Sequence, residues 1–154
     1  MPTPAVHTLI DADVPHQLHT FDAGTSHFGE HAVAALDVDP ALILKTLIVD
    51  TGRGLAVCCI PVPHRLSLKK AAAALGCKSV SMADPKKAQR STGYVPGGIS
   101  PLGQKHPLPT VIDAGVEKQP TVYVSGGRRG LDIALAPRDL ARLTGAQFSA
   151  ISSG

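Results

Sequence analysis

The chain has 154 residues, of which 44% are hydrophobic and 18% charged, and its formal net charge is +3. This length and composition predict one globular domain over residues 1–154, with a core of its own. Aromatic residues make up 3% of the chain and tryptophan is absent, which argues against the stacked aromatic surfaces of single-strand nucleic-acid binders. The small positive charge is compatible with a phosphate-bearing partner but does not identify one.

Cysteine usage and the N-terminus indicate the compartment. Cys58 and Cys59 are adjacent and Cys77 stands alone, so we expect free thiols in a reducing cytoplasm. A thiol–base pair with His64 is a weak candidate, because cysteines within an apolar strand are usually small buried residues. The N-terminus lacks a basic region followed by an apolar stretch, so we expect no signal peptide and no membrane span.

Apolar periodicity and turn residues predict short elements in the first half of the chain. Ser26 and Ser67 are suitable helix N-caps, and Gly76 is suited to end the second helix. Residues 51–54, Thr-Gly-Arg-Gly, join two apolar runs and are typical of a β-hairpin. In chain order we expect a helix at 4–12, a strand at 16–21, a helix at 26–36, strands at 42–50 and 55–62, a helix at 67–75 and a strand at 78–82.

Short helices and strands are also predicted in turn along the second half of the chain. Asp84 followed by Pro85 is typical of an N-cap and a first helical residue, and Gly93 and Gly145 are suited to end helices. We expect a helix at 85–93, strands at 110–113, 121–125 and 131–135, a helix at 137–143 and a strand at 147–151. Because hairpins and short helices are interspersed, the sequence predicts an α+β fold with a mixed, mainly antiparallel sheet, partly barrel-like and surrounded by short helices.

Two loops, residues 89–104 and 125–132, are rich in glycine and polar residues. Such loops expose backbone N–H groups and let a ligand approach the main chain closely. The pairs Gly97-Gly98 and Gly126-Gly127 are candidate donors, although an ordinary turn is the commoner role of any one pair. The basic residues near these loops, which either contact nucleic-acid phosphates or form a solvated face, are Lys86, Lys87, Arg90, Arg128 and Arg129.

Two charged residues lie within apolar strands. Lys45 alternates with Ile43, Leu47 and Val49 on one strand face, where a lysine is seldom fully buried without a partner. It is either a cation at the floor of a pocket or a side chain that extends to solvent at a sheet edge. Asp132, in the strand at 131–135, binds a hydroxyl or amine, pairs with Lys45, or is an exposed strand residue. No Walker, GxSxG or GxGxxG pattern occurs, and we expect neither a metal nor a cofactor.

Several segments together resemble the YbaK/EbsC family of aminoacyl-tRNA deacylases. The resemblance is to the Cys-tRNA(Pro) deacylase branch, which is related to the editing insertion domain of prolyl-tRNA synthetase, and it extends over nearly the whole chain in one register. The segments that carry it are Lys45-Thr46-Leu47, Met82–Pro85, Ala88–Tyr94, Gly97–Gln104, Leu108–Asp113 and Tyr123–Ile133.

The resemblance implies a cytoplasmic trans-editing enzyme that hydrolyses Cys-tRNA(Pro) and forms a transient complex with prolyl-tRNA synthetase. The family's essential lysine corresponds to Lys45 and its functional aspartate to Asp132. The residues implied to bind the substrate are Phe21, Thr46, Gly97, Gly98, Ile99, Ser100, Ser125, Gly126 and Gly127. One departure concerns Phe21, because the family often has a tyrosine at this position. The ring is kept and the hydroxyl is lost, which puts substrate preference or rate in doubt.

The implied mechanism needs no protein nucleophile. The thiol of a cysteinyl substrate attacks its own ester carbonyl and leaves as a cyclic thiolactone, while the protein imposes the geometry and stabilises charge. Lys45 would hold a ribose, phosphate or carbonyl oxygen, and Asp132 the amino group or a ribose hydroxyl. Two alternatives stay open. One is hydrolysis of Ala-tRNA(Pro) or another aminoacyl ester by water, and the other is a non-catalytic module that binds the tRNA end.

Overall fold

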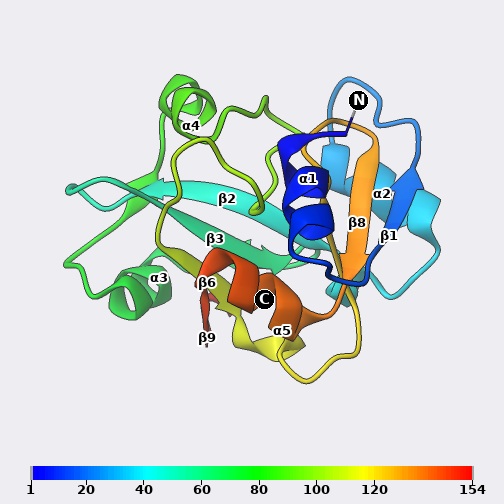
Figure 1. Cartoon of the computed structure of the whole chain (residues 1–154). Coiled ribbons are helices and arrows are strands. Elements are labelled where there is room, and N and C mark those ends of the chain that lie inside the picture. The colour runs from blue at the N-terminus through cyan, green and yellow to red at the C-terminus, as the bar shows by residue number, and fades with distance from the viewer. Residues whose placement is uncertain (1, 154) are drawn as a thin grey trace.

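Three sheets, with helices packed around them, make up the fold in a computed structural model that describes residues 2–153 (Figure 1). The helices are α1 (Pro4–Asp11), α2 (Phe28–Leu36), α3 (Leu68–Leu75), α4 (Pro85–Thr92) and α5 (Pro137–Thr144), with 3-10 turns η1 (Pro40–Leu42) and η2 (Ala114–Val116). The strands are β1 (Gln17–Thr20), β2 (Leu44–Asp50), β3 (Leu55–Pro61), β4 (Arg65–Leu66), β5 (Ser81–Met82), β6 (Thr110–Asp113), β7 (Val122–Ser125), β8 (Leu131–Leu135), β9 (Gln147–Ser149) and β10 (Ser152–Ser153).

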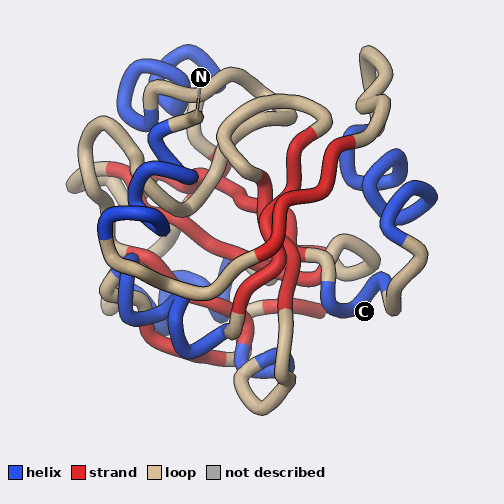
Figure 2. Tube along the Cα trace, turned by 45° about the vertical axis from the view of Figure 1, so that its right-hand side comes forward, coloured by secondary structure: helices blue, strands red, loops and turns tan. Residues whose placement is uncertain are grey.

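The strand pairing is mixed and mainly antiparallel, which confirms the predicted α+β class. The largest sheet has the order β5-β2-β3-β6-β9, a second sheet has the order β1-β8-β7, and β10 pairs with β4. Only the β3–β6 and β6–β9 ladders are parallel among the described strand pairs. The two larger sheets meet at a bridge between Ile43 and Tyr123 and do not close into a barrel, which corrects the barrel-like detail. Figure 2 shows the strands crossing the centre of the molecule with the helices outside them.

The five-stranded sheet is buried on both faces. One face packs with the three-stranded sheet, α1 and α5 in a core that includes Ile48, Val57 and Ile112. The other face packs on α3 and includes Val49 and Ile60. Because successive side chains of β3 enter opposite cores, its sequence reads as one continuous apolar run rather than an alternating one.

Three predicted elements differ from the observed ones. Helix α2 begins at Phe28, after His27 in a left-handed conformation that supplies no side-chain cap, so Ser26 is not its cap. The strand expected at 78–82 shortens to β5, which pairs with only the end of β2. The strand expected at 147–151 ends at Ser149 as β9, and β10 follows at Ser152–Ser153. Between them, Asp113 Oδ1 accepts the N–H groups of Ile151 at 3.0 Å and Ser152 at 3.2 Å, which takes these groups out of strand pairing.

Candidate active site

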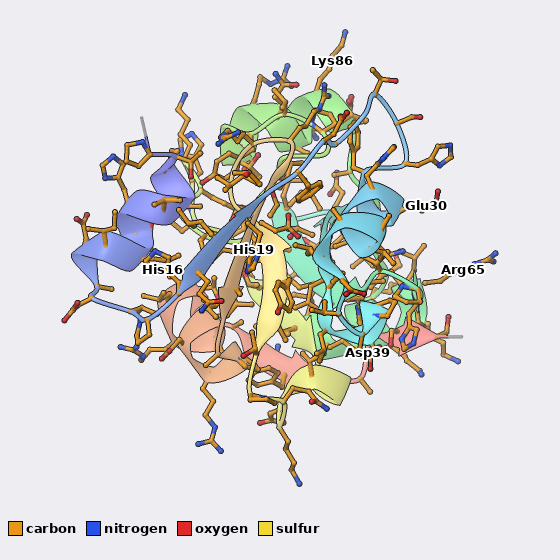
Figure 3. All side chains as sticks on the ribbon, turned by 90° about the vertical axis from the view of Figure 1, so that its right-hand side faces the viewer. His16, His19, Glu30, Asp39, Arg65 and Lys86 are labelled. Atoms are coloured by element: carbon orange, nitrogen blue, oxygen red, sulfur yellow. The ribbon has the colours of Figure 1, made fainter. Side chains whose placement is uncertain are left out.

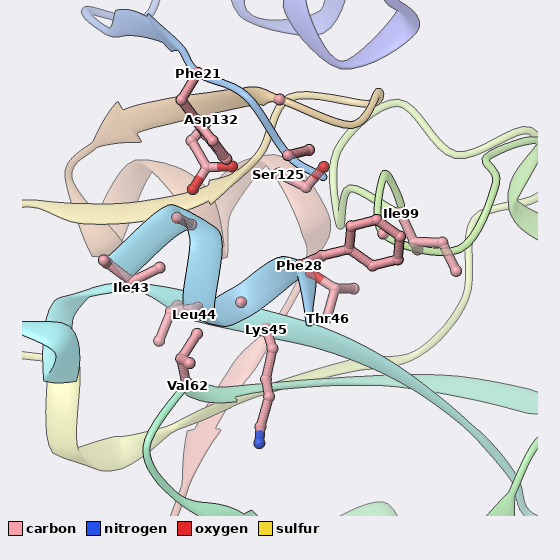
Figure 4. A pocket seen from close by; sticks show the side chains of 15 residues that line it. Phe21, Phe28, Ile43, Leu44, Lys45, Thr46, Val62, Ile99, Ser125 and Asp132 are labelled. Atoms are coloured by element: carbon pink, nitrogen blue, oxygen red, sulfur yellow. The ribbon is translucent and has the colours of Figure 1, made fainter. Parts of the chain in front are cut away.

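A pocket of about 200 Å³ lies where the three-stranded sheet, β2 and α2 meet (Figure 4). Its volume is below the range of roughly 300–1,000 Å³ that is usual for pockets of drug-sized ligands, so it suits a small group. Seven of the predicted site residues line it: Phe21, Lys45, Thr46, Gly97, Ile99, Ser125 and Asp132. The remaining lining residues are Ala23, Phe28, Gly29, Ala32, Ile43, Leu44, Val62 and Gly130.

Strand β8 places Asp132 in the pocket wall. In the sheet register Asp132 lies opposite His19 on β1 and opposite Ser125 on β7, so these three side chains share one face. Leu131 and Ile133 on the other face enter the core. The Asp132 side chain is directed into the pocket in Figure 4, and the residue is 7% exposed. Burial raises the pKa of its carboxyl group to about 7.

This raised pKa predicts a pH-dependent effect of Asp132→Asn on stability. The carboxyl group of the unfolded chain ionises near its ordinary pKa of 3.8, whereas that of the folded protein stays protonated up to about pH 7. Folding stability is therefore lost as the pH rises from about 4 through 7, and an uncharged side chain escapes that loss. We expect Asp132→Asn to raise the free energy of unfolding at pH 8 by up to about 4 kcal/mol and to have little effect at pH 4. Denaturant unfolding at both pH values measures this, and equal effects at the two would contradict it.

Lys45 and Thr46 lie side by side on β2 and point to opposite faces of it. Thr46 Oγ1 is buried and has no hydrogen-bond partner within residues 2–153. This oxygen is buried, and Thr46 lies opposite Cys59 of β3 in the sheet register, so the hydroxyl group lies beside that thiol and is not open to the pocket. Lys45 lines the pocket, but in Figure 4 its ammonium group extends away from Asp132. Burial, and to a smaller extent the charge of Arg65, lowers the pKa of Lys45. No ion pair joins Lys45 and Asp132 in the described part of the chain.

Most backbone N–H groups of the glycine loops form hydrogen bonds within the protein and do not face the pocket. Gly97 lines the pocket, whereas Gly98, Ser100, Gly126 and Gly127 are not among its lining residues. Gly98 N–H donates to Val95 O at 2.9 Å, and Gly126 N–H donates to Leu131 O at 2.7 Å. Gly127 N–H donates to Ser125 Oγ at 3.3 Å, and the fully buried Ser100 accepts the Leu102 N–H at its Oγ.

The two loops come into close backbone contact at Gly98. A Cβ atom at this position would lie 2.9 Å from the backbone of Arg128. We expect Gly98→Ala to lower the free energy of unfolding by about 1–3 kcal/mol, because backbone on the second loop has to move. Denaturant unfolding measures the change. Gly115→Ala is the control, because Gly115 likewise has no left-handed φ and its Cβ position has only the Asp113 Oδ2 atom, at 3.2 Å, as a close neighbour. Unchanged stability of Gly98→Ala would contradict the close loop contact.

Helix α2 and His19 contribute to this region without having been predicted as site residues. Phe28, Gly29 and Ala32 of α2 line the pocket; the apolar face of this helix was visible in the sequence, but its position over β2 was not. His19 Nε2 is buried without a hydrogen-bond partner within residues 2–153. The His19 and Tyr123 rings pack edge-on, with 5.7 Å between their centroids. His19 belongs to β1, and Figure 3 shows it near the centre of that view.

The cysteines and histidines lie outside the pocket lining. None of Cys58, Cys59 and Cys77 lines it, and burial raises the pKa of Cys58 to about 11 and that of Cys59 to about 12. His27 and His31 have the i, i+4 spacing that two metal ligands on a helix share. Across residues 2–153, no group of three or more His, Cys, Asp or Glu side chains is arranged to hold a metal ion. In the same residues, no helix is long and apolar enough to cross a membrane.

The fold and the pocket define a small α+β domain with a buried carboxyl group in the wall of a pocket sized for a small group. The family model of the aminoacyl-tRNA editing domain matches residues 22–143. A protein of Enterococcus faecalis named "Putative Cys-tRNA(Pro)/Cys-tRNA(Cys) deacylase EbsC" is 35% identical over 153 residues, which cover 98% of this chain and 93% of that protein. The chain therefore belongs to the aminoacyl-tRNA editing domain family, and its activity is that of an aminoacyl-tRNA deacylase.

Solved structures agree with this assignment. A crystal structure described as a "putative trans-editing enzyme for prolyl tRNA synthetase" is 26% identical, with a TM-score of 0.82, and the match covers 97% of this chain and 93% of that chain. A crystal structure of a hypothetical protein is also 26% identical, with a TM-score of 0.87 and coverage of 97% of this chain and 99% of that one. The fold is thus shared over almost the full length of both.

Proposed function

We propose that this deacylase hydrolyses Cys-tRNA(Pro) in the cytoplasm, as a trans-editing enzyme that associates transiently with prolyl-tRNA synthetase. The observation that carries the proposal is the small pocket that presents one buried carboxyl group and no cysteine of the protein. Its size suits an aminoacyl group rather than a whole nucleotide. The names of the Enterococcus relative and of the trans-editing structure support the substrate class and the link to the synthetase.

The substrate's own thiol supplies the nucleophile in this proposal. The thiol loses its proton, its sulfur forms a bond to the ester carbonyl carbon, and the bond from that carbon to the terminal ribose oxygen breaks. The ribose oxygen takes up a proton, so the proton lost by the thiol is balanced. The products are a cyclic thiolactone and free tRNA. The apolar lining, including Phe28, Ile43 and Val62, folds the short side chain over its carbonyl group and excludes water, which accounts for a rate advantage without a protein nucleophile.

Polar groups on the lining orient the ester. The Asp132 carboxylate receives the substrate's amino group or a ribose hydroxyl. Of the four loop glycines proposed as donors, Gly97 lines the pocket and its N–H group donates to no other group within residues 2–153. Phe21 closes the pocket with an apolar ring and holds its place because its N–H group donates to Gly130 O at 2.9 Å.

The decisive experiment compares three substrates with the same enzyme. These are Cys-tRNA(Pro), Cys-tRNA(Pro) with its thiol methylated, and Ala-tRNA(Pro). We expect rapid loss of the first ester alone. Equal hydrolysis of the methylated ester would overturn the thiol attack, and preferred hydrolysis of the alanyl ester would assign the pocket to water-mediated alanyl editing.

The enzyme's own thiols are expected to be dispensable. Cys58 and Cys59 are fully buried and their pKa values lie far above neutral pH, and thiols that are not ionised are poor nucleophiles. The variants Cys58→Ser, Cys59→Ser and Cys77→Ser, each first shown to be folded by circular dichroism, should keep the deacylation rate within about twofold of the wild-type rate. Loss of deacylation in a folded Cys→Ser variant would contradict the proposed mechanism.

A further inference from the structure

The excess positive charge of the chain is concentrated in one segment. Residues 85–112 contain four of the fifteen Lys and Arg residues and none of the twelve Asp and Glu residues. The rest of the chain therefore carries eleven basic and twelve acidic residues. A charge of one sign confined to one segment produces a local positive potential that the modest net charge of +3 conceals.

Some of the basic residues in and near this segment already contact other groups of the protein, and others do not. Lys87 Nζ lies 3.8 Å from Asp50 Oδ2. Arg129 Nε donates to Pro96 O at 2.7 Å, and its guanidinium group lies 4.8 Å from the centre of the Phe28 ring. By contrast, Lys86, Arg90 and Lys105 are exposed and form no ion pair within residues 2–153.

These three cations line one groove beside α4. The groove has a volume of about 520 Å³ and is lined by Lys86, Gln89, Arg90, Gly93 and Lys105. Its lining has no carboxylate and no aromatic or aliphatic anchor of the kind that dominates protein–protein interfaces. Cations that line one groove without such anchors are suited to the phosphates of a nucleic-acid backbone.

The groove is held in a defined shape. The Asp84 side chain caps α4 by accepting the Lys86 N–H at 2.9 Å. At the other end of the helix, Lys105 N–H donates to Thr92 O at 2.9 Å, and His106 N–H donates to Ser91 O at 3.1 Å. The segment with Lys105 is therefore fixed against the end of α4, and a Cβ atom on Gly93 would lie 3.3 Å from the Lys105 Cβ.

A short stretch of chain connects the groove to the pocket. Gly93 lines the groove, and Gly97 and Ile99 line the pocket. Helix α4 lies at the surface of the molecule (Figure 1), and the Lys86 side chain extends outward from it (Figure 3). A ligand with its reactive end in the pocket thus has a basic surface within reach of its more distant phosphates.

We propose that the groove of Lys86, Arg90 and Lys105 binds backbone phosphates of the tRNA acceptor end while the aminoacylated terminal nucleotide occupies the pocket. This inference rests on the proposed deacylation of aminoacyl-tRNA. The groove contributes affinity without selecting an amino acid, because phosphate contacts position a nucleic acid and carry no information about the ester.

The test is a triple variant, Lys86→Gln, Arg90→Gln and Lys105→Gln, with a control of equal charge change, Lys69→Gln, Lys78→Gln and Lys118→Gln. Each enzyme is assayed on Cys-tRNA(Pro) and on a cysteinylated dinucleotide that ends in the terminal adenosine. We expect the groove variant to lose about tenfold or more of kcat/KM on the tRNA only, with a salt slope shallower by about 2. The control variant should keep both values within twofold.

Binding of uncharged tRNA(Pro) tests the groove independently of catalysis. Fluorescence anisotropy of labelled tRNA should show weaker binding by the groove variant than by the control variant. Equal binding and equal kcat/KM of the two variants would overturn the proposal. A loss that occurs only after prolyl-tRNA synthetase is added would also overturn it, in favour of a protein contact. Wild-type enzyme that binds tRNA but hydrolyses neither ester would contradict the proposed function and not the groove.

Discussion

Replacing Asp132 by asparagine is expected to lower kcat/KM for the cysteinyl ester at pH 8 by about 100-fold. A hydrogen bond to a charged group contributes about 1.5–3 kcal/mol, and this carboxylate is buried in the pocket wall, where water screens it little. Asparagine keeps the size of the side chain and removes its charge. Single-turnover deacylation of Cys-tRNA(Pro) measures the loss.

The pH dependence of this loss distinguishes an electrostatic role from a purely structural one. The pKa of Asp132 is raised to about 7 by burial, so the carboxylate is mostly protonated at pH 5.5 and mostly ionised at pH 8.5. The ratio of wild-type to Asp132→Asn rates should therefore increase as the pH rises through 7. Taking the ratio cancels the ionisation of the substrate's own thiol, which both enzymes share. A ratio that stays constant across this range would contradict a role for the ionised carboxylate.

Replacing Lys45 by alanine is expected to lower kcat/KM by about 10- to 100-fold, mainly through a higher KM. Among the residues that line the pocket, Lys45 is the one with a cationic side chain. Because its ammonium group extends away from Asp132, we expect it to hold a phosphate or ribose oxygen of the terminal nucleotide rather than the ester carbonyl. A charge-assisted hydrogen bond of this kind contributes about 1.5–3 kcal/mol. Steady-state kinetics with varied Cys-tRNA(Pro) measures KM and kcat separately.

Two further variants test whether the effect of Lys45→Ala comes from the lost charge at this position. Lys45→Arg keeps the charge at a different geometry and should restore part of the affinity. Lys118→Ala removes an exposed lysine that is not among the pocket-lining residues and should behave like the wild type. A fall in kcat with KM unchanged would contradict the assignment to the terminal nucleotide, because it would show an interaction made only in the transition state.

Local sequence signals were sufficient for most elements of this fold. The Thr-Gly-Arg-Gly turn joins β2 and β3 as predicted, with Thr51 N–H donating to Gly54 O. Ser67 and Asp84 cap α3 and α4 through their side chains. These features depend on residues close in sequence. The prediction of Ser26 as a cap was wrong because the chain reaches α2 through His27 in a left-handed conformation, which no local pattern indicated.

For the site, the sequence by itself determined that Lys45 and Asp132 are unusual, because a charge within an apolar strand stands out from its neighbours. Tertiary structure decided the rest. It placed Asp132 opposite Ser125 and His19, brought α2 over β2 as a wall, and used the N–H groups of Gly98, Gly126 and Gly127 inside the protein. The physical reason is that strand alternation and caps are local, whereas register between distant strands and the direction of a side chain depend on packing between segments far apart in the chain.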